Sequence, residues 1–260
     1  MNGQNFGATW LASDAGRQGV MNFDANEGDQ IVVRGYPQLN SSYGTISFWV
    51  RLDSFPGTGN ESAMVMDRRD TGGGGSGTII GINDGPDNAG TVFFQANPTG
   101  ANPFSTWTTI NDGNWHHVAV TYGQAVGELV TIYIDGAMDA VQNNNLAWWW
   151  PSDMSVLLGK SRDGYWKKLH GRLDDVRFYN RVLDNQEVAQ LATDAVVDAN
   201  ALVLRLNFDA APAPGYRLST SPIAGTIQGA ATVDGSYTDV GASPCLHISG
   251  ATQFFRARIP

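Results

Sequence analysis

The sequence predicts an all-β protein, built as a two-sheet antiparallel β-sandwich with one short helix near residues 184–192. Three observations carry this prediction. Apolar and polar residues alternate with a period of two along many short segments. Turn residues separate those segments, and glycine is abundant, with 31 residues. Charged residues make up only 16% of the chain, which disfavours a fold made of amphipathic helices.

The clearest strands are three alternating segments, at residues 45–52, 115–122 and 129–135, each followed by turn residues. Shorter candidates lie at residues 30–33, 78–82, 91–95, 155–158 and 173–179. Many short strands with loops between them are typical of two antiparallel sheets that pack face to face. The residues placed to fill the space between the sheets are Phe48, Val50, Val118, Val120, Ile132 and Ile134.

One segment has the pattern of a helix. Asp184 can cap it, and Glu187 lies three residues later, which is the spacing of a capping box. Val188 and Leu191 then share one face. The sequence therefore predicts a single short helix after the last strand. The longest irregular stretches, which are either hairpin tips or functional loops, lie at residues 67–77, 83–90 and 97–106.

Length and charge limit the class of protein. The 260 residues suit one large sandwich, or one domain and part of another. A net charge of −9 argues against nucleic acid and anionic membranes as partners, and no apolar stretch is long enough to span a membrane. The lone Cys245 excludes an internal disulfide. We expect an extracellular or cell-surface location, although the N-terminal stretch carries no secretion signal.

Four sequence blocks resemble the laminin-G-like domains of the concanavalin-A-like jelly-roll superfamily, in that family's order. They are MNFD at 21–24 with DQIVV at 29–33, TISFWVR at 45–51, DGNWHHVAVTY at 112–122 leading into VTIYIDG at 130–136, and LG at 158–159 with GRLDDVRFYNRVL at 171–183. The resemblance covers roughly residues 6–192 and implies a jelly-roll domain over residues 1–195.

Residues 196–260 form a C-terminal segment that resembles the start of a second repeat. Residues 201–209 are similar to the first strand of such a domain, 229–232 to residues 7–9, 245–248 to 20–23, and 255–260 to 31–37. Either the chain holds part of a tandem array, or the strand at 202–208 returns to complete the first sandwich. We expect the segment to pack on the first domain or complete it, because a lone sheet exposes its edges, and association through it is possible.

The superfamily that these blocks resemble includes endoglucanases, whose signature is a Glu-x-Asp-x-x-Glu run. That run is absent from this sequence. Asp174 and Asp175 are adjacent, so on a regular strand their side chains would face opposite sides of the sheet. The sequence therefore predicts a protein that is not an enzyme.

Binding of a polysaccharide or oligosaccharide is the leading hypothesis, because indole and phenol rings suit the apolar faces of sugar rings. Three consecutive tryptophans cannot all face one core on an extended chain. The candidate sugar-binding residues are Trp148, Trp149, Trp150, Tyr165, Trp166 and Trp107. Packing of these rings inside the protein and a protein interface are the alternatives.

A structural calcium ion is a second expectation. The resemblance implies that Asp24 and Asp29 in the first block and Asp174 in the last block supply carboxylates. Asn26 or Gly28 would add oxygens, and the ion would fasten the loop to the last strand. Aspartates that only hold turns are the alternative.

Two functional hypotheses follow. The first is a non-catalytic carbohydrate-binding module of a larger extracellular enzyme or surface protein. The second is a protein–protein adhesion or structural spacer module without glycan binding.

Overall fold

The computed structural model describes residues 3–25, 28–53, 62–70, 76–85, 87–96, 104–151, 154–209, 226–230, 238–242 and 254–258. Two sheets of eight strands each form the main body, and a further sheet has three strands. The part of the chain that is described holds no helix with the length and apolar character needed to cross a membrane. Cys245 and Asn26 lie outside the described residues, as do parts of the predicted irregular stretches, residues 71–75, 86 and 97–103.

Sheet A has the strand order β1-β4-β13-β6-β7-β8-β9, with β14 paired in parallel to β6. Its strands are β1 (Gly3–Phe6), β4 (Gln30–Val33), β6 (Ala63–Arg69), β7 (Gly77–Ile82), β8 (Thr91–Ala96), β9 (Phe104–Thr109), β13 (Val156–Leu158) and β14 (Lys167–Lys168). A short 3-10 helix, Pro37–Leu39, follows β4.

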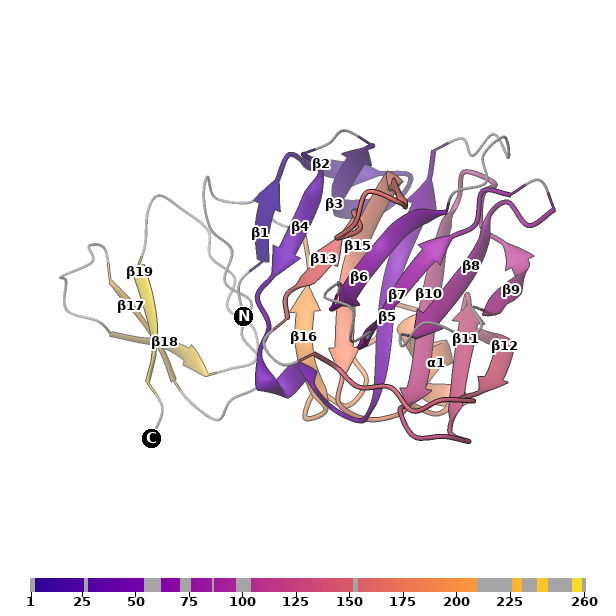
Figure 1. Cartoon of the computed structure of the whole chain (residues 1–260). Coiled ribbons are helices and arrows are strands. Elements are labelled where there is room, and N and C mark those ends of the chain that lie inside the picture. The colour runs from indigo at the N-terminus through magenta and orange to yellow at the C-terminus, as the bar shows by residue number, and fades with distance from the viewer. Residues whose placement is uncertain are drawn as a thin grey trace.

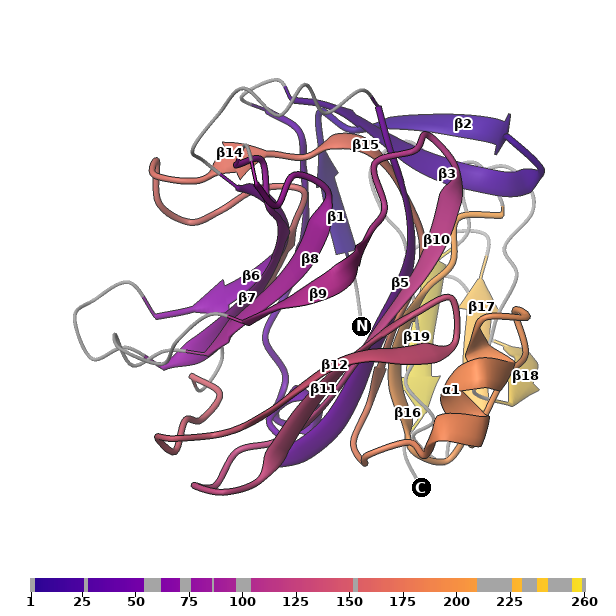
Figure 2. The same cartoon turned by 90° about the vertical axis from the view of Figure 1, so that its right-hand side faces the viewer.

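Sheet B has the order β12-β11-β10-β5-β15-β3-β2, with β16 paired to β15. Its strands are β2 (Thr9–Asp14), β3 (Arg17–Asp24), β5 (Tyr43–Leu52), β10 (Trp115–Gly123), β11 (Leu129–Ile134), β12 (Ala137–Asn143), β15 (His170–Tyr179) and β16 (Leu202–Leu206). The two sheets face each other, and the helix α1 (Asn185–Leu191) lies on the outer side of sheet B (Figures 1 and 2). The predicted two-sheet sandwich is confirmed.

The core lies between the two sheets, and strand alternation places its residues. Phe48 of β5 lies opposite Val118 of β10 in the register, and both side chains are buried. Val65, Ile80 and Phe94 are buried in the same core from the side of sheet A. Burying large aliphatic and aromatic side chains of this kind is the main stabilising term of the sandwich.

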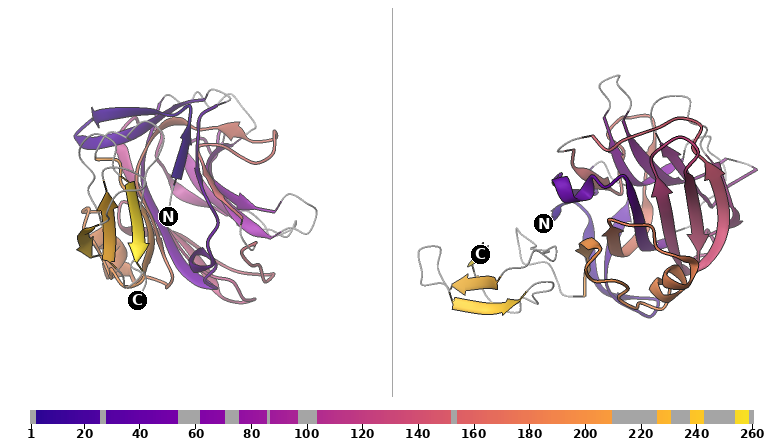
Figure 3. Two further views of the ribbon diagram at one scale, coloured as in Figure 1. Left: turned by 90° about the vertical axis from the view of Figure 1, so that its left-hand side faces the viewer. Right: turned by 90° about the horizontal axis from the view of Figure 1, so that it is seen from below.

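Helix α1 begins as predicted. Asp184 accepts a hydrogen bond from the Glu187 backbone N–H, and the Glu187 side chain accepts one from the Asp184 backbone, which completes the capping box. Val188 and Leu191 pack with Tyr179 on the outer face of sheet B. The helix therefore covers part of a sheet face that would otherwise meet water (Figure 3, right).

Strand β16 belongs to the first sandwich. It pairs antiparallel with the second half of β15, with Leu206 opposite Val176. Leu204 and Phe208 are buried in the main core, and Trp10 Nε1 donates to the Phe208 carbonyl at 2.8 Å. The body of the domain thus extends past residue 195 to residue 208.

Sheet C is built from later parts of the C-terminal segment, as β17 (Thr226–Ala230), β18 (Thr238–Ala242) and β19 (Phe254–Arg258). Strand β17 pairs antiparallel with β19. The sequence of β17 runs into the stretch that is similar to residues 7–9, which follow β1. The sequence of β19 lies in the stretch that is similar to residues 31–37, which begin within β4. Strands β1 and β4 also pair antiparallel. That the C-terminal segment is the start of a second repeat stays a prediction.

Candidate functional site

The three consecutive tryptophans lie on an extended segment after β12, and they alternate in direction. Trp148 and Trp150 are 2% and 5% exposed, whereas Trp149 is 52% exposed. Trp148 packs edge-on against Trp150 at a ring separation of 5.1 Å, within the core between the sheets. This corrects the prediction that Trp148 and Trp150 bind sugar, because a ring enclosed by the core cannot meet a ligand.

Trp150 is held by a buried arginine. The guanidinium carbon of Arg68 lies 4.6 Å from the Trp150 ring centroid, and Arg68 donates to the Leu39 carbonyl at 2.6 Å. Trp150 Nε1 donates to the hydroxyl of Tyr122 at 3.2 Å. Burial lowers the pKa of Arg68 to about 10, which leaves it charged at neutral pH. These contacts give Trp150 a packing role.

Tyr165 and Trp166 lie on the outer face of sheet A, on the segment between β13 and β15. Trp166 packs on Phe93 of β8 at a ring separation of 5.6 Å, over a small buried cluster with Met64 and Ile79. Tyr165 stands edge-on against Trp166 at 4.9 Å and is 66% exposed. The structure therefore brings these two predicted residues together as an exposed aromatic surface with a fixed base.

A charged network fastens the same segment to sheet A. The buried carboxylate of Asp67 accepts hydrogen bonds from Ser161 Oγ at 2.9 Å and from Arg69 at 2.7 Å. Arg69 also donates to Asp163 at 2.9 Å, and Asp163 accepts from the Tyr165 backbone N–H at 3.2 Å. The partly exposed Asp163 carboxylate is thus bound to the backbone of Tyr165. We call residues 161–166 the aromatic segment.

Trp107 and Trp149 are exposed elsewhere. Trp107 lies on the edge strand β9 and is 88% exposed, while its backbone N–H donates to Asp139 of β12 at 2.6 Å. The Trp149 carbonyl accepts from the Gly77 backbone N–H at 2.8 Å. Within the described ranges, the ring contacts of the aromatic segment join Tyr165, Trp166 and Phe93 and include neither of these tryptophans.

The three predicted calcium ligands are not brought together. Asp24 lies opposite His170 at one end of β15, and Asp174 lies four residues further along that strand. Arg17 NH2 is 2.8 Å from Asp174 Oδ2, so this carboxylate already has a cationic partner. In the described ranges, no group of three or more His, Cys, Asp and Glu side chains is placed to hold a metal ion. One site with all three carboxylates does not fit this geometry.

Asp24 and Asp29 do share a loop. Asp29 Oδ2 accepts from the Asp24 backbone N–H at 2.9 Å, and burial together with the nearby Asp24 carboxyl raises the pKa of Asp29. A Cβ on Gly7 would lie 2.6 Å from Asp29 Oδ1, so the glycine makes room for the buried Asp29 carboxyl. The calcium prediction is thereby narrowed to these two carboxylates and stays a prediction.

Asp174 and Asp175 share one face of sheet B, which corrects the expectation that they point to opposite faces. The register of β15 shifts between Asp174 and Arg177, and Asp175 has a φ of +47°. This β-bulge turns Asp175 to the outer face, where Arg177 and Arg205 donate to it at 3.0 and 2.7 Å. Each carboxylate is therefore neutralised by arginine.

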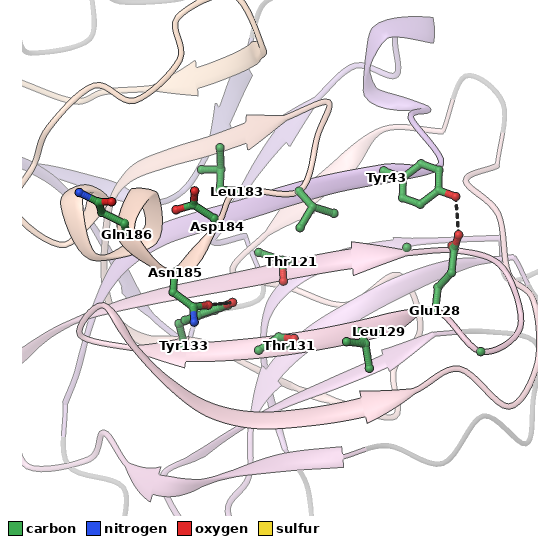
Figure 4. Close-up of a pocket in the computed structure, with 13 residues that line it drawn as sticks. Tyr43, Thr121, Glu128, Leu129, Thr131, Tyr133, Leu183, Asp184, Asn185 and Gln186 are labelled. Atoms are coloured by element: carbon green, nitrogen blue, oxygen red, sulfur yellow. Dashed lines mark hydrogen bonds between the residues drawn. The ribbon is translucent and has the colours of Figure 1, made fainter.

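A groove of about 660 Å³ lies on the outer face of sheet B. Its floor carries Thr121 and Thr131 of two adjacent strands (Figure 4). The Tyr43 hydroxyl donates to Glu128 at one end. At the other end the hydroxyl of Tyr133 donates to Asn185 Oδ1 at 2.8 Å. Its remaining lining residues are Gly123, Gly127, Leu129, Val182, Leu183, Asp184 and Gln186.

The model of one protein family matches this chain. It describes the concanavalin A-like lectin/glucanases superfamily and matches residues 24–189, well over half of the chain. The chain belongs to this superfamily. The laminin-G-like resemblance of the four sequence blocks is thereby confirmed, and the comparison with curated protein sequences gives no match.

Solved structures show the same superfamily fold at low identity. The binding domain of Paraclostridial Mosquitocidal Protein 1 has a TM-score of 0.58 at 18% identity, over 91% of this chain and 57% of that one. A putative carbohydrate binding protein from Bacteroides ovatus has 0.57 at 17%, over 77% and 58%. Domain 4 of AbnA, an arabinanase from Geobacillus stearothermophilus solved with arabinotriose, has 0.52 at 18%, over 71% and 81%. The chain spans little more than half of the first two.

Two features of this superfamily member escaped the sequence analysis. Strands β7 and β8 read GTIIGI and TVFFQA, and these continuous apolar runs indicate burial on both faces. That signal predicts that the outer faces of β7 and β8 are covered, but it does not say that the aromatic segment covers them. The groove on sheet B carries no such signal, because its lining comes from strand ends and from the start of α1.

Proposed function

We propose that the protein is a non-catalytic carbohydrate-binding module, which recognises a polysaccharide or oligosaccharide at the aromatic segment on sheet A. One observation carries the proposal. The ring of Tyr165 is two-thirds exposed, and Trp166 holds it in place from a buried base. A ring that is already fixed loses little conformational freedom when a sugar packs against it.

Polar side chains bound to the same segment would supply the hydrogen bonds of a sugar-binding surface. A pyranose or furanose presents an apolar C–H face and a rim of hydroxyl groups, so its site needs an aromatic face and nearby hydrogen-bonding groups. Asp163 and Arg69 lie in the network next to Tyr165, and Asp163 remains partly exposed. A domain from an arabinanase and a putative carbohydrate binding protein share this fold, which is consistent with the proposal.

The absence of catalysis is part of the proposal. A glycosidase needs one carboxyl group that can donate a proton and a second carboxylate that acts as nucleophile or base. Asp174 and Asp175 are the adjacent pair on β15. Both are buried on the outer face of sheet B, and each is paired with arginine side chains. We infer further that the module belongs to a larger extracellular or cell-surface protein.

Affinity electrophoresis in gels that contain soluble plant or algal polysaccharides, arabinan among them, tests the proposal. We expect retardation by at least one polysaccharide, and we expect Tyr165→Ala to weaken binding about tenfold, or about 1.4 kcal/mol. Tyr165→Phe keeps the ring and should retain binding. Tyr43→Ala, on the opposite sheet, is the matched control for the loss of an exposed tyrosine. Retardation that survives Tyr165→Ala would overturn the assignment of the site.

The second candidate is a protein–protein adhesion or spacer module. The specific observation in its favour is the groove on sheet B, whose rim exposes aliphatic side chains. If a broad glycan array gives no binding, this function becomes the leading one.

A further inference from the structure

The groove on sheet B lies on a different sheet from the aromatic segment, and its rim exposes aliphatic side chains. Leu129 and Val182 on its rim are about half exposed, and so is the ring of Tyr43. The apolar surface continues to the edge of the sheet, because Val141 of β12 lies opposite Thr131 and is also half exposed. Exposed apolar side chains gathered on one face mark a contact surface.

The charges in the groove are all of one sign. Among its lining residues the ionisable acids are Glu128 and Asp184, and none of the lining residues is a lysine or arginine. Hydrogen bonds from the Tyr43 hydroxyl and the Ala125 backbone N–H lower the pKa of Glu128, so it is a carboxylate at neutral pH. Glu128 has no basic side chain among the lining residues of the groove, and a carboxylate next to aliphatic side chains attracts a cation that carries its own apolar stem.

The nearest arginine in sequence does not neutralise these carboxylates. Arg181 precedes Val182, but its guanidinium donates to Glu187 at 2.5 Å and to Asp198 at 2.5 Å. Its charge is therefore balanced outside the groove. The net charge of the whole chain, −9, adds a long-range attraction for a basic partner.

The geometry also argues against a sugar in this groove. Of the two tyrosines, Tyr133 is buried and has its hydroxyl bound to Asn185. Tyr43 forms one end of the groove, and its hydroxyl is bound to Glu128 (Figure 4). The floor between them carries threonines and no flat ring on which a sugar could stack.

We propose that this groove binds a lysine- or arginine-bearing segment of a partner protein, with the aliphatic stem along Leu129 and Val182 and the cation at Glu128. The site goes beyond glycan recognition and does not depend on it. A module with both sites would join a glycan on sheet A to a protein on sheet B.

The test uses the full chain, labelled with 15N, and three capped tripeptides as probes: acetyl-Val-Lys-Val-amide, its neutral norleucine analogue and its glutamate analogue. We expect the lysine peptide to shift backbone signals of Thr131, Leu129 and Val182, and to bind at least fivefold more tightly than either analogue. Equal binding of the norleucine peptide, shifts confined to other surfaces, or no shifts at 10 mM peptide would overturn the proposal.

Two opposite substitutions at one exposed position test the sign of the interaction. Gln186 lies on the groove and is exposed at the start of α1. Gln186→Glu should tighten binding of the lysine peptide and Gln186→Lys should weaken it, each by less than about threefold, because position 186 lies at the end of the groove away from Glu128 and the interaction is screened by solvent. Asp87→Asn, which removes an exposed carboxylate from the loop between β7 and β8, is the control and should change little. The same response to both Gln186 variants would contradict an electrostatic site.

The two proposed sites fail separately. Tyr165→Ala should leave binding of the lysine peptide unchanged, and Gln186→Lys should leave glycan retardation unchanged. If a retarded glycan competes with the peptide for the groove, the groove is a glycan site and the protein-binding proposal is wrong.

Discussion

Arg17 NH2 lies 2.8 Å from Asp174 Oδ2, and both side chains are largely buried. The guanidinium of Arg17 also lies over the ring of Trp49, 4.3 Å from its centroid. The β2–β3 hairpin is in this way tied to the middle of sheet B. The same ion pair occupies the carboxylate that the sequence assigned to calcium.

Removal of Arg17 should therefore destabilise the fold. Arg17→Met leaves the buried Asp174 carboxylate without a cation, and we expect the free energy of unfolding to fall by about 3 kcal/mol. The double variant Arg17→Met/Asp174→Asn removes both charges and should recover most of that loss. Urea denaturation followed by tryptophan fluorescence measures both. An equal loss in the single and double variants would show that packing on Trp49, and not the ion pair, carries the effect.

Two groups beside Trp49 should respond to pH in opposite directions. His117 and Asp174 lie opposite Trp49 on its two neighbouring strands. Burial lowers the pKa of His117 from 6.5 to about 4, with Arg177 acting in the same direction. Burial raises the pKa of Asp174 from 3.8 to about 6, although Arg17 opposes the shift.

Between pH 6.5 and 4 the unfolded chain protonates His117 before the folded protein does, so stability is lost as the pH falls. Between pH 6 and 3.8 the folded protein holds a proton on Asp174 that the unfolded chain releases, so stability is gained as the pH falls. Each contribution is at most roughly 3 kcal/mol. Relative to the unsubstituted protein, we expect His117→Gln to gain stability and Asp174→Asn to lose stability as the pH falls from 7 to 4.5. Thermal unfolding at each pH measures both differences. Parallel pH profiles of the two variants would contradict this.

A calcium ion bound at the loop of Asp24 and Asp29 should stabilise the fold without any contribution from Asp174. We expect CaCl2 to raise the melting temperature relative to EDTA, since a ligand present at 100 times its Kd adds about 2.7 kcal/mol. Asp29→Asn should abolish the rise and Asp174→Asn should keep it. No difference between CaCl2 and EDTA in the unsubstituted protein would exclude a structural calcium ion.

Strand alternation predicted many strands of the sandwich, but it missed others, among them β6 with its buried charged side chains. The expected strand 30–33 coincides with β4, and 129–135 nearly coincides with β11. Strand β6, AMVMDRR, was not predicted, because Asp67 and Arg68 resemble loop residues in sequence. Both are buried, and their partners come from distant segments at Ser161 and Leu39. A local pattern does not contain such partners.

The candidate site shows the same limit. Alternation implied that the three tryptophans could not share one face, yet it did not say which of them would be exposed. The direction of each tryptophan ring depends on how the segment crosses from sheet B to sheet A. On that crossing the Trp148 backbone N–H donates to the Gln124 carbonyl, and the Trp149 carbonyl accepts from the Gly77 backbone N–H. The bulge at Asp175 likewise depends on pairing with β5, so the shared face of Asp174 and Asp175 could not be predicted.

The tryptophans themselves give a clear comparison. Trp148→Ala and Trp150→Ala each leave a large cavity in the core and should lower the free energy of unfolding by about 3–5 kcal/mol. Trp149→Ala, the matched control one residue away, should cost under about 1 kcal/mol because its ring is half exposed. Urea titration of the three variants measures the difference. A large cost for Trp149→Ala would place that ring in an interface.

Strand β16 gives the last prediction, which concerns where the module ends. Leu204 is buried in the main core, and Arg205 donates to the buried Asp175 at 2.7 Å. Leu204→Ala should therefore cost about 2–5 kcal/mol, as a core leucine does. Val196→Ala, at an exposed position just before the strand, should cost little.

A protein that ends at residue 209 should keep the pH and urea responses of the full chain, whereas one that ends at residue 195 exposes the second half of β15 and should aggregate. A stable, monomeric product from the shorter protein would show that β16 is dispensable and that the domain ends near the helix.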